Sequence, residues 1–317
     1  ADAGRPGADP HGAQRRCRLF GDKVSGFSTA MAKVPFKVSF SSIPDETSAM
    51  ADLVLPDNHS LESWGDAEPV KGTLSLQQPA MDPVFDTRAT GDVLLSISTM
   101  PDTAAQAADY RTYFISRFAG GASALAQALP KGITSGSATS PSPRAVPDPI
   151  AAAQTTGDYF LMVYPSPALG NGAGANKPWL QELPDPVTKI AWQTVAEIHP
   201  STAKKLGVEN GDHITVETSA GKLSLPVYVY LGVRPDTVAV AAGRGHSEVA
   251  GRYAKAGSNA FDLLAYSEDR SGAIAVTSTR AKVTKDGDFS RLVTTEGSAR
   301  QHGRGIGQAM LVGDLGK

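Results

Sequence analysis

The pattern of apolar and polar residues predicts a strand-rich second half of this chain. From Tyr159 onward, short apolar or alternating stretches recur with the spacing typical of β-strands. They predict strands at 159–164, near 188–198, and at 213–218, 223–231, 237–242 and 273–283. Residues that favour tight turns flank the 213–218 stretch, at Asn210-Gly211-Asp212 and Ala220-Gly221-Lys222. Many short strands around one short helix favour a small closed barrel.

The ends of that helix, and the faces of one strand, are visible in the sequence. We expect Ser201 to cap the first turn of the helix and Gly207 to end it. In the 223–231 strand, the odd-numbered residues are all apolar and share one face. Pro226 lies among them and cannot donate a backbone hydrogen bond, which predicts an edge strand or an interrupted ladder.

The first half contains brief elements in quick succession. The expected elements are a helix at 27–33, a strand at 36–40, a short helix at 45–50 and a brief buried strand at 52–56. This order predicts part of a parallel α/β layer that is too short for a complete doubly wound domain. A polar, turn-rich stretch follows at 57–88, and helices are expected at 92–97 and 103–129.

Changes in composition predict how the chain is divided. Residues 1–26 are rich in Arg, Gly, Asp and Pro and lack apolar periodicity, which indicates a disordered or non-native leader. We expect a partial α/β domain at 27–129 and a barrel domain at 158–286. Residues 130–157 have the composition of a linker, and residues 287–317 that of a polar tail.

Charge and cysteine content exclude several classes of function. The formal net charge of −2 gives no electrostatic basis for nucleic-acid binding. The sequence has no apolar run of about 18 residues, so we expect no membrane span. Cys17 is the one cysteine among 317 residues, which excludes an internal disulfide, a thiolate zinc site and a four-cysteine iron–sulfur cluster within this chain.

Two segments carry a resemblance to a known family. Glu197-Ile198-His199-Pro200, followed by Leu206-Gly207 and Gly211-Asp212, resembles the C-terminal domain of the molybdopterin oxidoreductases. In the first half, residues 47–56 resemble the α/β third domain of the same family. The resemblance implies an α/β remnant of a Rossmann-like layer, followed by a mainly β double-psi β-barrel. In the family, this barrel closes over a pterin-guanine dinucleotide cofactor.

A narrower resemblance concerns two further motifs. Residues 177–188 and Gly243-Arg244-Gly245-His246 resemble the molybdopterin-type iron–sulfur subunit of alternative complex III, a bacterial membrane complex that oxidises quinol. This implies that the chain is a C-terminal fragment of that region, because the family's metal ligand and cluster cysteines lie elsewhere. It also implies other subunits of a membrane-bound complex as partners, and a peripheral location on the periplasmic side of the inner membrane.

The resemblance also implies where a cofactor would bind. The cofactor-binding candidates lie in glycine-rich loops or next to them: Asn171, Gly172, Trp179, Gly243, Gly245, His246 and Asn259. Backbone amides of such loops can approach phosphate or pterin closely. Each candidate also has a structural interpretation: a plain surface loop around Asn171, an anchor that packs this loop for Trp179, and internal hydrogen bonding for His246 and Asn259.

Three functional hypotheses fit these residues. The first is a non-catalytic scaffold in a quinol-oxidising respiratory complex, with no cofactor in this chain and iron–sulfur clusters outside it. The second is an active molybdenum bis-pterin oxidoreductase, similar to polysulfide or thiosulfate reductases, which holds molybdopterin guanine dinucleotide. The third is a non-redox barrel used as an interaction module, because a fold does not determine function. We predict no catalytic residue and no metal ligand in this chain.

Overall fold

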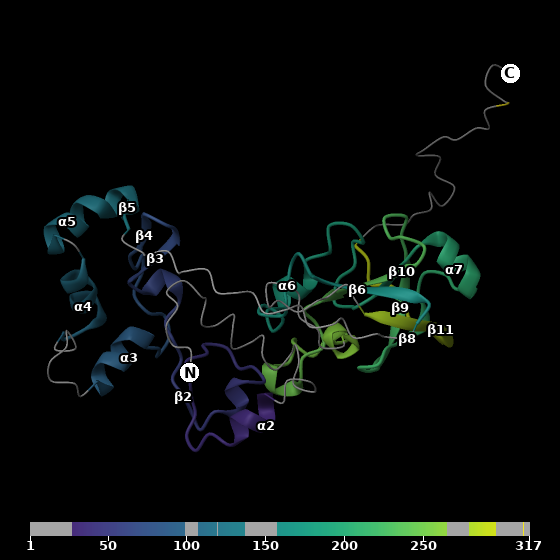
Figure 1. Ribbon diagram of the computed structural model, residues 1–317, viewed down its shortest axis with the longest axis horizontal. Helices are drawn as coiled ribbons and strands as arrows, with labels where there is room; N and C mark the ends of the chain where they lie inside the picture. Colours follow the sequence, from purple (N-terminus) through teal and green to yellow (C-terminus); the bar gives the residue numbers. More distant parts are fainter. Residues whose placement is uncertain are drawn as a thin grey trace, which may run out of the picture.

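The computed structural model describes residues 27–98, 107–118, 120–136, 157–264, 279–295 and 313 (Figure 1). The expected leader, most of the expected linker and most of the expected tail therefore lie outside the described residues. The described helices and strands form a barrel in the second half and smaller sheets with helices in the first. None of the described helices has the length and apolar composition that crossing a membrane requires.

The second half forms a closed barrel, as its strand pattern predicts. Its strands are β6 (Tyr159–Pro165), β7 (Ala196–Ile198), β8 (Asp212–Glu217), β9 (Lys222–Val229), β10 (Thr237–Ala242) and β11 (Arg280–Phe289). Their order around the barrel is β10-β6-β11-β8-β9-β7. The pairs β6–β10 and β7–β9 are parallel, and the other pairs are antiparallel. The mainly β barrel is therefore confirmed, with mixed strand directions.

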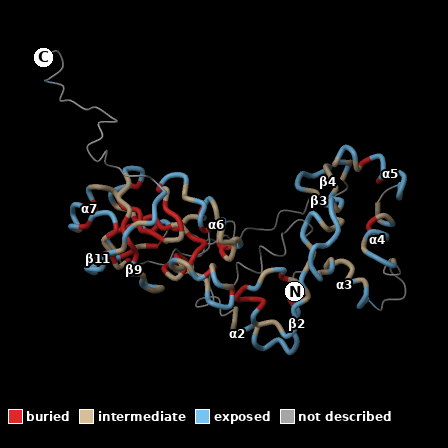
Figure 2. Tube along the Cα trace, turned by 180° about the vertical axis from the view of Figure 1, so that it is seen from behind, coloured by how far each residue is buried: buried red, intermediate tan, exposed pale blue. Residues whose placement is uncertain are grey.

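Alternating side chains of these strands fill the barrel interior. Ile214 and Val216 on β8 and Leu225 and Val227 on β9 are completely buried. Leu161, Ile198, Val238 and Val240 complete the centre of this core. Figure 2 shows the buried positions concentrated in the barrel, while the first half is mostly exposed. Because side chains alternate in direction along a strand, the residues directly before and after each of these buried residues face outward.

Two details of the barrel differ from the prediction. His199, rather than Ser201, caps helix α7 (Pro200–Leu206), because its imidazole accepts a hydrogen bond from the Ser201 amide and Pro200 favours the first helical turn. Gly207 ends the helix at φ 65°, as predicted. β9 is not an edge strand: Pro226 is paired with His213 of β8, and the pairing of β9 with β7 begins at the next residue, Val227.

The strand expected near 188–198 is mostly a loop. Only Ala196–Ile198 pairs as β7, and the residues before it cross the outside of the barrel. At the other end, β11 continues to Phe289 through a register shift between Lys285 and Phe289. Leu231 lies beyond the end of β9 and is 78% exposed, so the apolar face of this strand ends at Val229.

The first described elements form a parallel pair of very short strands. Helix α2 (Phe27–Ala32) comes first, and β1 (Val38–Ser39) pairs with β2 (Leu53–Val54) across the 3-10 helix η1 (Ser48–Met50). The expectation of a buried strand here is wrong, because Leu53 and Val54 are 42% and 43% exposed. A parallel sheet is normally covered on both faces, and this pair remains open among the described residues.

The remaining elements of the first half form a small sheet with three helices. These elements are β3 (Gly65–Val70), β4 (Thr73–Gln77), β5 (Ile133–Ser135), α3 (Thr90–Ile97), α4 (Tyr110–Arg117) and α5 (Gly121–Ala128). Residues 57–88, which are expected to be rich in turns, thus contain the β-hairpin of β3 and β4. The single long helix expected over 103–129 breaks before Gly120, whose φ of 88° is left-handed and cannot continue a helix.

The barrel core generates a stability prediction. We expect Leu225→Ala to lower the free energy of unfolding by about 2–5 kcal/mol, because it leaves a cavity at a completely buried position. Urea unfolding monitored by circular dichroism measures the change. Leu231→Ala is the matched control, since the same substitution at an exposed position removes little buried surface. Equal effects of the two substitutions would contradict the assignment of Leu225 to the core.

Candidate functional site

Strand topology brings two of the predicted loops together. The loop with Asn171 and Gly172 follows β6, and the loop with Gly243 follows β10. Because β6 and β10 are parallel neighbours, both loops leave the barrel at the same end. A Cβ atom added to Gly243 would lie 2.9 Å from the carbonyl oxygen of Gly170 and 3.3 Å from the amide nitrogen of Gly172. The two loops are therefore in direct backbone contact.

The other predicted glycine of this loop meets a third segment. A Cβ atom on Gly245 would overlap the backbone of Ser258 and Asn259, which only a glycine permits at a φ of 74°. Asn259 caps the 3-10 helix η6 (Ala260–Leu263), since its side-chain oxygen accepts a hydrogen bond from the Phe261 amide. Asn171, Gly172, Gly243, Gly245 and Asn259 thus belong to one cluster of loops.

His246 faces the first half of the chain. Its Nδ1 lies 3.2 Å from both carboxylate oxygens of Glu46, and the Ser247 amide donates to Glu46 at 2.8 Å. Burial alone raises the pKa of Glu46, but the hydrogen bonds from His246 and Ser247 outweigh it and lower the pKa to about 2. The ionised carboxylate therefore holds the hydrogen of His246 on Nδ1. The His246 side chain is 8% exposed, and its Nε2 is buried without a hydrogen-bond partner among the described residues.

The charged residues Glu46, Asp52 and Arg88 of the first half have separate partners. Asp52 pairs with Lys37 at 2.9 Å, and Arg88 donates to the backbone oxygen of Asp92 at 3.4 Å. Glu46 instead joins residues 200 positions later in the sequence. No local pattern in the sequence distinguishes the buried Glu46 from exposed glutamates, so sequence reasoning could not find this pair.

Trp179 directly follows the loop that contains Asn171 and Gly172. It is 64% exposed on helix α6 (Pro178–Glu182), so its interpretation as a packing anchor is wrong. Gln181 on the same helix is completely buried and holds the loop after β6 in place of Trp179. Its Nε2 donates to the Ala175 oxygen at 2.8 Å, and its Oε1 accepts from Arg244 Nε at 3.0 Å. Gln181 and Arg244 therefore tie the loop after β6 to the loop after β10.

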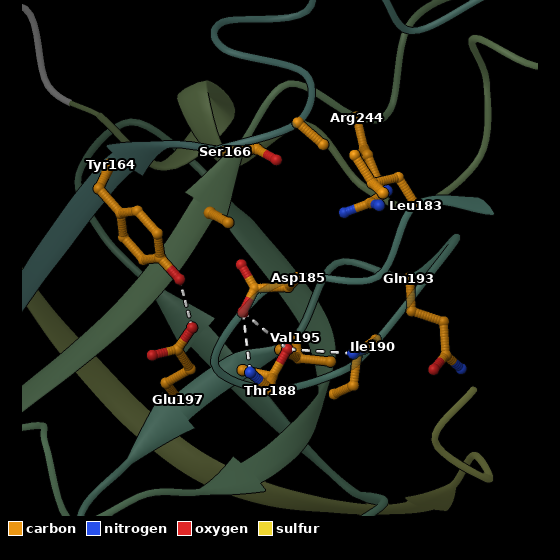
Figure 3. A pocket seen from close by; sticks show the side chains of 12 residues that line it. Tyr164, Ser166, Leu183, Asp185, Thr188, Ile190, Gln193, Val195, Glu197 and Arg244 are labelled. Atoms are coloured by element: carbon orange, nitrogen blue, oxygen red, sulfur yellow. Dashed lines mark hydrogen bonds between the residues drawn. The ribbon is translucent and has the colours of Figure 1, made fainter. Parts of the chain in front are cut away.

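A small polar cavity lies beside Arg244 (Figure 3). Its volume is about 20 Å³, enough for about one water molecule. The polar residues that line it are Tyr164, Ser166, Asp185, Thr188, Gln193, Glu197 and Arg244. On its floor, the Tyr164 hydroxyl donates a short hydrogen bond to Glu197.

The Tyr164–Glu197 pair depends on the small side chains of β10. In the barrel, Ala241 is opposite Tyr164 and Ala239 is opposite Glu197, so β10 separates the two partners. The methyl groups of these alanines leave room for the pair to meet above the strand. Burial raises the pKa of Glu197, and the nearby Asp185 carboxylate raises it further, although the Tyr164 hydroxyl opposes this. Burial and Glu197 also raise the pKa of Tyr164 well above its usual value.

The loop cluster, as arranged, does not fit a pterin dinucleotide. The space beside Gly243 and Gly245 is filled by the chain itself, and a Cβ atom on Gly257 would lie 2.6 Å from Thr194 Oγ1. The adjoining cavity of about 20 Å³ is far smaller than the ~300–1,000 Å³ of typical ligand pockets. Among the described residues of this cluster, His246 favours a ligand, because its buried Nε2 has no hydrogen-bond partner. Cofactor binding by the seven candidate residues therefore remains a prediction.

His59 and Glu62 have side chains of the kinds that bind metals, and both have a structural role here. His59 and Glu62 form a capping box on the 3-10 helix η2 (Ser60–Glu62), in which each side chain accepts a backbone hydrogen bond. Within the described parts of the chain, no three His, Cys, Asp or Glu residues converge to hold a metal ion. Cys17 lies outside the described residues.

Comparison with known proteins identifies the family. Residues 179–284 match the family described as "Molydopterin dinucleotide binding domain". The chain is 29% identical over 264 residues to the menaquinone reductase molybdopterin-binding-like subunit of Nitratidesulfovibrio vulgaris, covering 80% of this chain and 38% of that protein. Residues 179–284 therefore belong to this domain family, and the chain as a whole is similar to a molybdopterin-binding-like subunit. The matched region contains Trp179, Gly243, Gly245, His246 and Asn259.

Subunits described as molybdopterin-containing match shorter parts of the chain. The arsenate respiratory reductase molybdopterin-containing subunit ArrA of Shewanella sp. is 39% identical over 113 residues, covering 33% of this chain and 13% of that protein. The thiosulfate reductase subunit PhsA of Salmonella typhimurium is 37% identical over 75 residues, covering 24% of this chain and 9% of that protein. The chain thus spans less than half the length of each of these relatives.

The Glu46–His246 pair generates a pH prediction. We expect Glu46→Gln to lower the free energy of unfolding at pH 7 by roughly 1–3 kcal/mol, because a neutral amide binds these donors less strongly than a carboxylate. An acid whose pKa is lowered on folding stabilises the fold above its unfolded value of 4.5, and this contribution is lost as the pH falls toward about 2. The difference in the free energy of unfolding between variant and wild type should therefore shrink as the pH falls from 4.5 toward about 2. Urea unfolding at a series of pH values measures it.

Glu248→Gln is the control for this experiment. Glu248 pairs with Lys255, but its side chain is 85% exposed, so we expect little change at any pH. A Glu46→Gln variant as stable as wild type at pH 7 would contradict a stabilising role of the pair.

Proposed function

We propose that the chain acts as a non-catalytic scaffold within a quinol-oxidising respiratory electron-transfer complex of the alternative complex III type. In this proposal, the barrel docks other subunits, no cofactor binds to this chain, and iron–sulfur clusters are carried elsewhere in the complex. The complex is membrane-bound, and this part is peripheral on the periplasmic side of the bacterial inner membrane. The name of the menaquinone reductase relative, a molybdopterin-binding-like subunit, agrees with such a role.

The observation that carries this proposal is the self-filled loop cluster. Gly243 and Gly245 have the conformations that allow a ligand to approach backbone, yet the loops after β6 and η5 (Glu248–Ala250) occupy the adjacent space. Arg244, which could balance phosphate charge, instead binds Gln181 and lies 7% exposed. A cofactor of dinucleotide size would require these loops to separate and these hydrogen bonds to break.

A second candidate is an active molybdenum bis-pterin oxidoreductase. The buried Nε2 of His246 favours it, because a buried nitrogen without a partner is costly and a ligand would relieve that cost. The arsenate and thiosulfate reductase relatives carry molybdopterin according to their names. In this candidate, Asn171, Gly172, Trp179, His246 and Asn259 contact the molybdopterin guanine dinucleotide together with Gly243 and Gly245. A non-redox interaction module is the third candidate.

Finer features of the fold belong to the same proposal. We infer that the barrel has double-psi connectivity, which its parallel pairs β6–β10 and β7–β9 support. We also infer that residues 27–129 are a Rossmann-like remnant, which the parallel pair β1–β2 supports. The division into 1–26, 27–129, 130–157, 158–286 and 287–317 stays part of this proposal.

Metal analysis of the natural full-length protein, purified with its partners, tests the proposed function. We expect iron without molybdenum or tungsten, and no pterin in the acid extract, measured by plasma mass spectrometry and by pterin fluorescence. Stoichiometric molybdenum with pterin would overturn the scaffold proposal in favour of the enzyme. Absence of all three metals from the purified assembly would overturn it in favour of the non-redox module.

A further inference from the structure

A loop that we call the strap, residues 185–195, covers the Tyr164–Glu197 pair from outside the barrel (Figure 3). Asp185 holds its start, because one carboxylate oxygen accepts hydrogen bonds from the Val187 and Thr188 amides at 2.9 and 2.8 Å. Inside the strap, the Lys189 amide donates to the backbone carbonyl oxygen of Asp185 at 2.9 Å. Buried residues Ile190, Ala191, Thr194 and Val195 press the strap onto the barrel.

The strap is fastened on its outer side by the chain that follows β11. The Ala191 amide donates to the Val293 oxygen, and the Thr295 amide donates to the Lys189 oxygen, both at 2.9 Å. Gln193 completes this contact, since its side chain donates to the Arg291 oxygen and accepts from the Val293 amide. None of these bonds belongs to the pairing of the barrel strands, so the strap can open without unfolding the barrel.

Two residues of the strap are held in a strained conformation. Lys189 and Trp192 have φ values of 58° and 62°, a region that bulky side chains rarely adopt. Each such residue costs of order 1–3 kcal/mol and persists only where the surroundings enforce it. Opening the strap releases this strain, which lowers the free energy required for opening.

Beneath the strap, the charges are unevenly balanced. Asp185 from the strap and Glu197 from β7 both face the cavity, with Tyr164 from β6 and Tyr230, which follows β9, beside them. Arg244 is the one cation that lines the cavity, and Asp185 attracts it. Ionised Glu197 would therefore place a second carboxylate in a cavity that holds about one water molecule.

We propose that the strap is a proton-controlled cover, which is closed when the Glu197 carboxyl is protonated and opens when Glu197 ionises. In the closed state, the protonated carboxyl keeps its contact with the Tyr164 hydroxyl and adds no charge beside Asp185. In the open state, water reaches Glu197 and stabilises its carboxylate. The proton passes from the carboxyl to solvent, and no other bond changes.

The sign of the pH dependence follows from this scheme. Because burial and Asp185 raise the pKa of Glu197 in the closed state, the closed state binds the proton more tightly than the open state. Closure is therefore favoured at low pH and is lost as the pH rises through the pKa of the closed state. One proton is involved, so the opening equilibrium constant rises by up to about tenfold per pH unit.

Hydrogen exchange of the full chain across pH 5–8, corrected for intrinsic exchange rates, tests this proposal. The reporters are the hydrogen-bonded strap amides of Lys189, Ala191 and Trp192, with barrel amides of β8 as the internal reference. In wild type, we expect protection of the strap to fall by up to about tenfold per pH unit while protection of the barrel stays constant. A parallel fall in both would overturn the proposal, because it would indicate global unfolding.

Two variants and a control identify the responsible group. Glu197→Gln keeps the shape of the protonated acid and accepts the Tyr164 hydroxyl, so its strap should stay protected at every pH. Asp185→Asn retains an oxygen that caps the strap but removes the charge that raises the pKa of Glu197 in the closed state, so the fall in protection should become smaller and end at lower pH. Glu217→Gln, at an exposed position on β8, should behave as wild type. An unchanged pH dependence in Glu197→Gln would overturn the proposal.

Discussion

The parallel pairing of β6 with β10 is the constraint on which the loop cluster depends. Parallel neighbours send their following loops to the same end of a sheet, so residues near position 170 and near position 243 meet without any direct sequence relation. Once they meet, only a glycine tolerates the approach of the two backbones at Gly243, and Gly245 allows the same approach to Ser258 and Asn259. The Arg244–Gln181 hydrogen bond then closes the cluster from inside.

The same strand arrangement determines what lies outside the barrel. Completely buried Val238 and Val240 of β10 face the core, so Ala239 and Ala241 must face outward. Their small size allows the neighbours of β10 on both sides to form the Tyr164–Glu197 hydrogen bond. A single strand thus contributes valines to the core on one face and space for a buried acid on the other.

The barrel was predictable from the sequence, whereas its polar contacts were not. Alternating residues such as Leu225 and Val227 have one stable arrangement, with apolar side chains inside, and this pattern is visible locally. The contact of Glu46 with His246 joins segments 200 residues apart and leaves no local periodicity. The strand expected near residue 190 failed for a related reason, because apolar strap residues are buried against the barrel without pairing in it. The cap of α7 was misplaced because His199 uses an imidazole nitrogen where a hydroxyl was expected.

The closed barrel has a consequence for assembly with other chains. Each of its described strands has a neighbour on both sides, so none of them is an edge strand open to a strand from another protein. In the described part of the chain, edge strands occur only in the first half, in the β1–β2 pair and as β3 and β5 of the β3-β4-β5 sheet. A partner that extends a sheet of this protein by strand addition must therefore attach to the first half, and a partner of the barrel must bind through side chains.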